Sequence, residues 1–247
     1  NGTEYQANTD NLCYYDTTTQ SVICGDATTS ATNTGNQPKS VVMGVGATST
    51  GETNVAIGAS SSANSTGAIA IGGSAKASDN QAIAIGLNAE AAADWDISIG
   101  RQAGFGTITP AVEGRNIAIG DGALKNATAP NNNIAMGTST GARLSGVRNV
   151  LLGTYASNHN AVQSAMGALA AMDGKIKPDG KFKTYDDLTV DEKTAYATQL
   201  GVKLDATSNT YYVNTNDTVA LGHRALATKT ADVAIGQQAK ATGGTSV

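Results

Sequence analysis

The sequence predicts an all-β fold, a parallel β-roll (solenoid) in which short strands stack as successive rungs, and three observations support it. A four-residue phrase recurs along the chain, in which two aliphatic residues surround a small one and glycine follows, as in Ile69-Ala70-Ile71-Gly72. From Gly44 to Gly100 the glycines of this phrase are 14 residues apart at every step. The chain also has 29 Gly but only 2 Phe and 1 Trp, a composition that suits thin layers of small side chains.

Each repeat reads as two short strands joined by turns. In the first strand, alternation places Ile69 and Ile71 on one face and Ala70 on the other. Glycine follows because the chain must turn sharply or take a positive φ there. We assign this repeat turn to Gly44, Gly58, Gly72, Gly86, Gly100, Gly120, Gly137, Gly153, Gly222 and Gly236.

The second strand carries an alanine three residues after the glycine, such as Ala75, and Asn or Asp often precedes the next repeat, as at Asn54 and Asp96. Asn and Asp suit a turn at that place. We expect a row of Ile or Val side chains to pack against a row of alanines inside each repeat, which leaves the Ala70 row as a flat apolar stripe on the surface. Because one thin roll buries little surface and apolar stripes mark association surfaces, the sequence predicts a homo-oligomer.

The spacing of the repeat widens to 20, 17 and 16 residues between Gly100 and Gly153. Insertions into solenoid repeats usually leave one face of the solenoid as loops. We therefore expect loops at Phe105–Gly114, near 127–132 and near 141–147.

The pattern divides the chain into four segments: an N-terminal cap at 1–40, roll repeats at 41–167, an inserted α+β subdomain at 168–217 and further roll repeats at 218–247. A solenoid needs a cap because its open last rung exposes hydrogen-bonding edges. In the cap, Cys13 and Cys24 flank a polar turn, so a β-hairpin would place them opposite each other and allow a disulfide. Such a disulfide would indicate an oxidising compartment or the cell exterior, and two free thiols are the alternative.

The segment after Gly153 departs from the repeat. Apolar residues between 160 and 172 follow helical spacing, which favours a helix, although the same residues also fit a degenerate rung. A hairpin is expected at 175–183 around Pro178-Asp179-Gly180. Thr189 and Glu192 form a capping box for a helix that runs to Leu200 and stops at Gly201, and a second hairpin is expected from 202–204 and 210–213.

Several repeats resemble the head repeats of trimeric autotransporter adhesins of the Yersinia-adhesin-like (YadA-like) family, whose repeat looks like [V/I]-A-[I/L]-G-x-x-A-x-A. The phrase appears in full from Ile69 to Ala77 and again in 83–91, 219–227 and 233–241. The resemblance implies a left-handed parallel β-roll, a homotrimer, and a place on the cell surface at the distal tip of a fibre anchored in the Gram-negative outer membrane. We expect the chain to be a head segment of such a longer fibre. The cap and the insertion suggest an N-terminal head, for which the Acinetobacter adhesin type is one candidate.

Composition and motifs argue against other functions. Lys and Arg number 16 and Asp and Glu 20, so a net charge of −4 gives no electrostatic reason to expect nucleic acid. No run of 18 apolar residues is present, so we expect no direct membrane contact from this segment. No spaced metal-ligand set, nucleophile elbow or phosphate-binding loop occurs, and we expect neither an enzyme nor a cofactor or metal.

The candidate adhesive residues lie outside the repeated strands. Trp95 and Phe105 are expected in loops, where each either contacts a partner or fills a gap beneath its loop. A basic cluster on the first expected hairpin either meets an anionic surface or is simply solvated, and it comprises Lys175, Lys177, Lys181 and Lys183.

The function that we predict is adhesion without catalysis. A trimeric head would attach to host extracellular matrix, to cells or to abiotic surfaces, and would aggregate cells, through many weak parallel contacts. The alternative is a structural β-solenoid such as a phage fibre or ice-binding module, although no ladder of one residue type is evident. A polysaccharide-active β-helix enzyme would need a carboxylate cluster across adjacent rungs, and the position after the repeat glycine has none.

Overall fold

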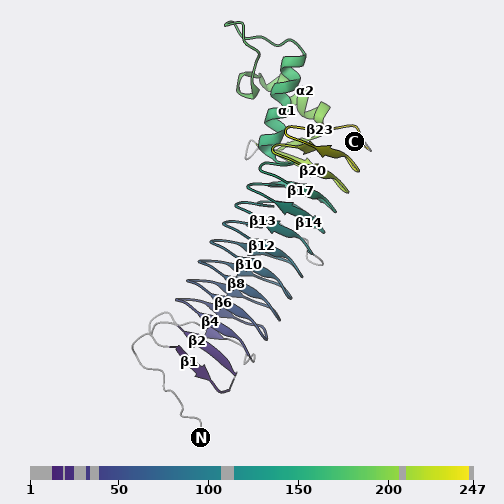
Figure 1. Cartoon of the computed structure of the whole chain (residues 1–247). Coiled ribbons are helices and arrows are strands. Elements are labelled where there is room, and N and C mark those ends of the chain that lie inside the picture. Colours follow the sequence, from purple (N-terminus) through teal and green to yellow (C-terminus); the bar gives the residue numbers. More distant parts are fainter. Residues whose placement is uncertain are drawn as a thin grey trace. The chain divides into compact units, whose positions relative to one another are not determined.

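The computed structural model describes residues 13–18, 20–24, 32–33, 39–106, 114–205 and 210–244. The chain divides into two compact units, Asn1–Asp121 and Gly122–Val247. Both units consist mostly of short β-strands in long parallel sheets, and the described residues of the second unit also contain two α-helices (Figure 1). The predicted class, mostly β with parallel stacking, is therefore confirmed.

The first unit has two sheets, and most of its repeats contribute one strand to each sheet. The strands of the first sheet follow one another in chain order, as Figure 1 shows for β4 to β13, and are β1 (Cys13–Asp16), β2 (Ser21–Cys24), β4 (Val41–Met43), β6 (Val55–Ile57), β8 (Ile69–Ile71), β10 (Ile83–Ile85), β12 (Ile97–Ile99) and β13 (Ile117–Ile119). Those of the second sheet are β3 (Thr32–Asn33), β5 (Thr48–Ser49), β7 (Ser62–Ala63), β9 (Lys76–Ala77) and β11 (Glu90–Ala91). From β2 onwards the pairing in the first sheet is parallel.

The start of the first unit is the expected hairpin. β1 and β2 pair antiparallel, with Cys13 directly opposite Cys24, and a disulfide joins the two cysteines. The prediction of this disulfide is therefore confirmed. Most of the remaining cap assignment at 1–40 lies outside the described residues.

The register stacks identical positions of successive repeats on one another, and this stacking explains the repeat glycines. Ile69, Ile83 and Ile97 lie side by side in neighbouring strands. A Cβ atom built on Gly72 would lie 2.6 Å from the carbonyl oxygen of Gly86 on the next rung, so only glycine fits. All ten glycines assigned to the turn have φ between 122° and 133°.

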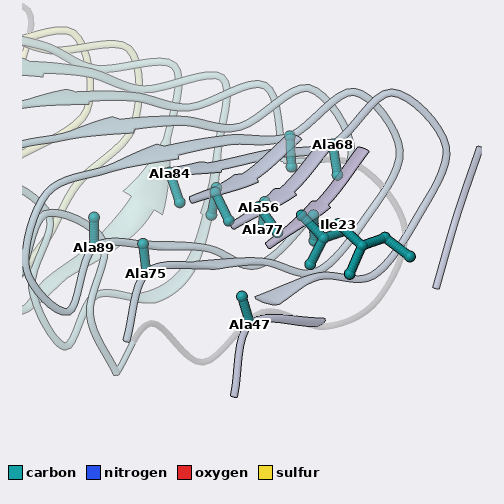
Figure 2. Close-up of a cluster of buried hydrophobic side chains, with 13 residues drawn as sticks. Ile23, Ala47, Ala56, Ala68, Ala75, Ala77, Ala84 and Ala89 are labelled. Carbon is teal, nitrogen blue, oxygen red and sulfur yellow. The ribbon is translucent and has the colours of Figure 1, made fainter. Parts of the chain in front are cut away.

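The interior of the first unit is lined by small side chains, not by isoleucine. Within one repeat Ala70, Ala75, Ala77 and Ala82 are all fully buried, whereas the isoleucines of β8 are only half-buried. Figure 2 shows equivalent buried alanines of neighbouring repeats gathered in one cluster. The expectation that the isoleucines pack inside and the Ala70 row lies outside is wrong, because a repeat of 14 residues closes too tightly to enclose larger side chains on every side.

The second unit repeats this arrangement, with longer second strands in some repeats and with larger side chains in the interior. Its first sheet contains β15 (Ile134–Met136), β17 (Val150–Leu152), β20 (Val219–Leu221) and β22 (Val233–Ile235). Its other strands are β14 (Thr128–Asn131), β16 (Leu144–Val147), β19 (Thr210–Asn214) and β18 (Lys203–Asp205) in one sheet, and β21 (Leu226–Ala227) with β23 (Lys240–Ala241) in another. Large side chains that are at least 98% buried lie in the interior, namely Leu124, Leu144 and Leu151. Leu226 is also buried, but it occupies the position of the exposed Lys76 in its repeat, on β21, against which α1 packs.

Two of the three expected loops are in fact strands. β14 and β16 occupy the stretches near 127–132 and 141–147 and pair with each other in parallel. Extra residues in these repeats therefore lengthen the rung itself, and the expectation of loops there is wrong. At the third place, Phe105–Gly114, residues 107–113 lie outside the described residues.

The elements expected between residues 160 and 213 are present. α1 (His159–Met172) is a helix, so the alternative of a degenerate rung is wrong. An antiparallel bridge between Ile176 and Phe182 forms the first hairpin. α2 (Val190–Leu200) follows the short 3₁₀ turn η1 (Tyr185–Asp187), begins with the capping box of Thr189 and Glu192, and ends at Gly201 with φ 69°.

The inserted elements and the roll are interleaved. The second hairpin pairs β18 with β19, and β19 also pairs in parallel with β16 of the roll. α1 starts before residue 168, where we expected the insertion to begin, and it packs against β19 and β21.

Candidate adhesive surfaces

Rows of aliphatic side chains lie along the outer face of the first sheet in each unit. In β6, β8, β10 and β12 the first and third residues are half-buried while the middle residue is buried. In the second unit the third residues include Met136 and Ile235, and Ile235 is 65% exposed. Contiguous apolar stripes of this kind mark association surfaces. The sequence predicted such a stripe but assigned it to the wrong row of residues.

Behind this face, buried polar residues join one repeat to the next. The Asn54 Oδ1 atom accepts a hydrogen bond from the Ala68 backbone N–H at 2.9 Å, and its Nδ2 atom donates to the Ala63 carbonyl oxygen at 2.9 Å. Asn149 and Asn133 form a similar link in the second unit. Sequence reasoning interpreted these residues as turn formers, but they are buried, and their hydrogen bonds satisfy backbone groups that would otherwise lack partners.

Asp96 occupies the same position as Asn54 and carries a carboxyl group into the interior. Its Oδ1 atom accepts hydrogen bonds from the backbone N–H and from the Nδ2 atom of Asn116, at 2.9 and 3.0 Å. Burial raises the pKa of Asp96, and these hydrogen bonds to the carboxylate act in the opposite direction. Its Oδ2 atom also accepts a hydrogen bond from the Ala93 backbone N–H of its own turn, at 3.2 Å. Because these bonds join its own turn to the next repeat, we assign Asp96 a structural role.

Trp95 projects from the turn before β12 and is 43% exposed. Its Nε1 atom donates to the Gln81 Oε1 atom at 3.0 Å, and the Arg115 guanidinium carbon lies 5.0 Å from the ring centroid. The indole thus contacts side chains of both adjacent repeats. Phe105 is 40% exposed and lies next to the residues that are not described.

Glu192 neutralises two of the four lysines in the expected basic cluster. The ammonium groups of Lys183 and Lys175 lie 3.0 and 3.6 Å from its carboxylate oxygens. A hydrogen bond from the Thr189 backbone N–H, followed by the Lys183 ammonium, lowers the pKa of Glu192 to about 2. These two lysines therefore brace the hairpin against the start of α2.

The remaining two lysines of that cluster also have acidic neighbours. Lys177 lies 3.4 Å from Asp187, and Lys181 lies 4.0 Å from Asp179 in the hairpin turn. The structure thus brings the four lysines together on one hairpin, but with carboxylates beside them, so they do not form a free basic patch.

An aromatic cluster that the sequence reasoning missed fixes α1 to β19. The His159 ring stacks on the Tyr211 ring with centroids 5.7 Å apart, and its Nδ1 atom accepts a hydrogen bond from the Tyr211 backbone N–H at 3.1 Å. Burial, and then the charge of Arg143, lower the pKa of His159. No sequence signal could have paired residues 52 positions apart.

Comparison with known proteins identifies the repeat. A family model described as the YadA head domain repeat matches residues 55–75, 63–89, 216–239 and 227–247. These repeats imply a β-roll and indicate the head of a trimeric autotransporter adhesin, a non-enzymatic class of surface-exposed protein. A search of curated proteins found no match to the chain.

Two further observations concern membranes and metals. Neither helix in the described ranges has the length and hydropathy that a membrane span requires. Within the same part of the chain, His, Cys, Asp and Glu side chains do not gather in threes or more at a place that could hold a metal ion.

Proposed function

We propose that this chain is the head of a homotrimeric adhesin, built as a left-handed β-roll, that attaches bacteria to host extracellular matrix, to cells or to abiotic surfaces. The observation that carries the proposal is the match to the YadA head repeat, in combination with the half-exposed aliphatic rows. The head would lie at the distal tip of a fibre anchored in the Gram-negative outer membrane.

The aliphatic rows supply a physical reason for the trimer. Alanines and other small side chains fill most of the interior of the first unit, and the larger isoleucines of its repeats lie on the outer face. Burying each of them between protomers would contribute on the order of 1 kcal/mol or more. Because such side chains recur in successive repeats, this stabilising free energy adds up along the roll. The other two protomers would thus complete a hydrophobic core that one thin roll cannot form alone.

Sedimentation equilibrium at micromolar concentration tests the trimer. We expect about three times the chain mass of 24.8 kDa. The double variant Ile71→Lys/Ile85→Lys should dissociate, because it places charges on the proposed interface. The control variant Lys76→Ala, which changes an exposed residue of the other sheet, should stay trimeric. A wild-type mass of 24.8 kDa would contradict the proposal.

Attachment itself needs a screen against several surfaces. Purified trimer is applied to collagen, fibronectin, laminin, plastic and glass, and the retained protein is measured. We propose Trp95 as a contact residue, so Trp95→Ala should reduce retention on at least one surface. Tyr15→Ala is the matched control, since Tyr15 is also an exposed aromatic residue of the first unit. If the trimer binds none of the five surfaces, the result would count against adhesion.

A further inference from the structure

A pocket of about 410 Å³ opens in the second unit between α1 and the segment that leads into η1. Phe182, Thr184 and Tyr185 line one side, residues of α1 line another, and Arg224 of the roll completes the wall. The segment approaches α1 closely at Gly167, where a Cβ atom would lie 3.5 Å from the Tyr185 backbone nitrogen. The volume falls within the range of small-ligand sites.

A second, smaller pocket has a volume of about 50 Å³. Ser164 and Arg224 line both pockets, whereas Gln238 and Lys240 line only the smaller one. The two pockets thus share Ser164 of α1 and Arg224 of the roll as lining residues, and we refer to the two together as the groove. Two cationic side chains, Arg224 and Lys240, line its smaller part.

Neither of these cations is neutralised within the described part of the chain. Arg224 and Lys240 have no carboxylate partner there, in contrast to the four lysines of the first hairpin. The Arg224 guanidinium stacks near the Tyr155 ring, 5.9 Å from its centroid, and its buried Nε atom has no hydrogen-bond acceptor. A buried donor without an acceptor is costly, and an anion entering the groove would satisfy it. Burial also lowers the pKa of Lys240, which a bound anion would reverse.

The rest of the large pocket is suited to a polyhydroxylated ring. Asn160, Gln163 and Ser164 bring amide and hydroxyl groups from the first turns of α1, and Asp186 adds a hydrogen-bond acceptor to the lining. Phe182 is 57% exposed at the rim, so an aromatic face is available for the apolar face of a sugar.

We propose that this groove binds a carboxylated sugar, with the carboxylate on Arg224 and Lys240 and the hydroxyl groups on the polar side chains of α1. This inference deepens the proposed adhesin function and rests on it. Sialic acids and uronic acids share the required chemistry, and the experiment below separates these two sources.

Isothermal titration of the folded trimer with 3′-sialyllactose, a hyaluronan tetrasaccharide and neutral lactose tests the proposal. We expect at least one acidic sugar to bind at least tenfold more tightly than lactose, and which one binds identifies the source. Arg224→Gln should weaken that binding at least tenfold, Lys240→Gln should weaken it less, and Arg224→Lys should retain part of it. The matched control is Arg101→Gln, since Arg101 is an exposed arginine of the first unit paired with Asp121.

Three outcomes would overturn the proposal: equal binding of lactose, no binding of either acidic sugar at millimolar concentration, or unchanged affinity in a folded Arg224→Gln trimer. Melting curves and sedimentation of each variant show whether it remains a folded trimer. These readouts keep a failure of the sugar site separate from a failure of the proposed adhesin, because mass and surface attachment are measured independently.

Discussion

The two units carry the same repeat phrase but enclose interiors of different size. In the first unit, the middle residue of the first strand is an alanine in β6, β8 and β10. In the second unit Leu151 occupies this position, directly between Ala135 and Ala220 of the neighbouring strands. The repeat from Gly137 to Gly153 has 16 residues where the first unit has 14 between Gly44 and Gly100. We infer that the longer repeat gives room for the larger Leu151 side chain in the interior.

The glycine column offers the most severe test of close stacking. In Gly86→Ala the new Cβ atom would lie 2.5 Å from the Gly100 carbonyl oxygen, and both groups are backbone. We expect a loss of more than about 4 kcal/mol in the free energy of unfolding, or failure to fold. Gly180→Ala is the control, because Gly180 also has positive φ but no atom lies within 4 Å of its Cβ position. Its cost should be about 1 kcal/mol, the conformational strain alone.

Chemical denaturation followed by circular dichroism measures both glycine variants. Similar losses at the two positions would mean that φ, and not the contact between rungs, selects glycine in the repeat.

A cavity in the wider interior should have the next largest effect. Leu151→Ala restores the alanine of the shorter repeats but leaves the longer rung around it, where Leu124 and Leu144 are also buried. We expect a loss of about 2–5 kcal/mol in the free energy of unfolding, from lost burial and the cavity together. A loss of less than about 1 kcal/mol in the free energy of unfolding would show that the rung contracts around alanine. The longer repeat would then not require a larger side chain in its interior.

The reverse change tests the narrow interior. Ala84→Val adds two methyl groups where Ala70 and Ser98 lie on either side in the sheet, and overpacking should cost about 1–3 kcal/mol. Leu151→Val is the matched variant in the wider unit, and it should cost less than Leu151→Ala because it leaves a smaller cavity. Stabilisation by Ala84→Val, measured by thermal melting, would reveal unfilled space in the first unit and contradict the comparison.

The smallest expected effect is a dependence on pH that is confined to the second unit. The pKa of His159 is lowered from 6.5 in the folded state, so the unfolded chain takes up the proton first on acidification. Stability should therefore be full above about pH 6.5 and fall as the pH drops below that value. Protonation would also break the hydrogen bond that the Nδ1 atom accepts from the Tyr211 backbone N–H.

The variant His159→Gln provides the comparison for this pH effect, because glutamine can accept a hydrogen bond but does not titrate. Melting temperatures of the wild type and the variant between pH 7.5 and 5 should converge as the pH falls. If the melting temperatures of the two proteins instead change in parallel over that pH range, His159 is not the cause of the pH dependence.

Many of the described elements followed from local patterns in the sequence, although β14 and β16 did not. The 14-residue period located the first strands and their glycines, the polar turn between Cys13 and Cys24 located the hairpin, and Thr189 with Glu192 located the start of α2. Each of these signals depends on residues that are neighbours along the chain or repeat at a fixed interval, so one sequence was enough to read them.

The tertiary structure alone decided which face of the strand is buried. Alternation places Ile69 and Ile71 on one face of the strand and Ala70 on the other, but it does not show which face points into the interior. Because isoleucine is larger and more apolar than alanine, we expected the isoleucine face to be buried. The closure of the roll reversed that choice, since most side chains in the narrow interior are single methyl groups such as those of Ala70, Ala75, Ala77 and Ala82. The meeting of His159 with Tyr211 and the groove at Arg224 and Lys240 likewise depend on tertiary structure, because the inserted helix α1 packs against β19 and β21 of the roll.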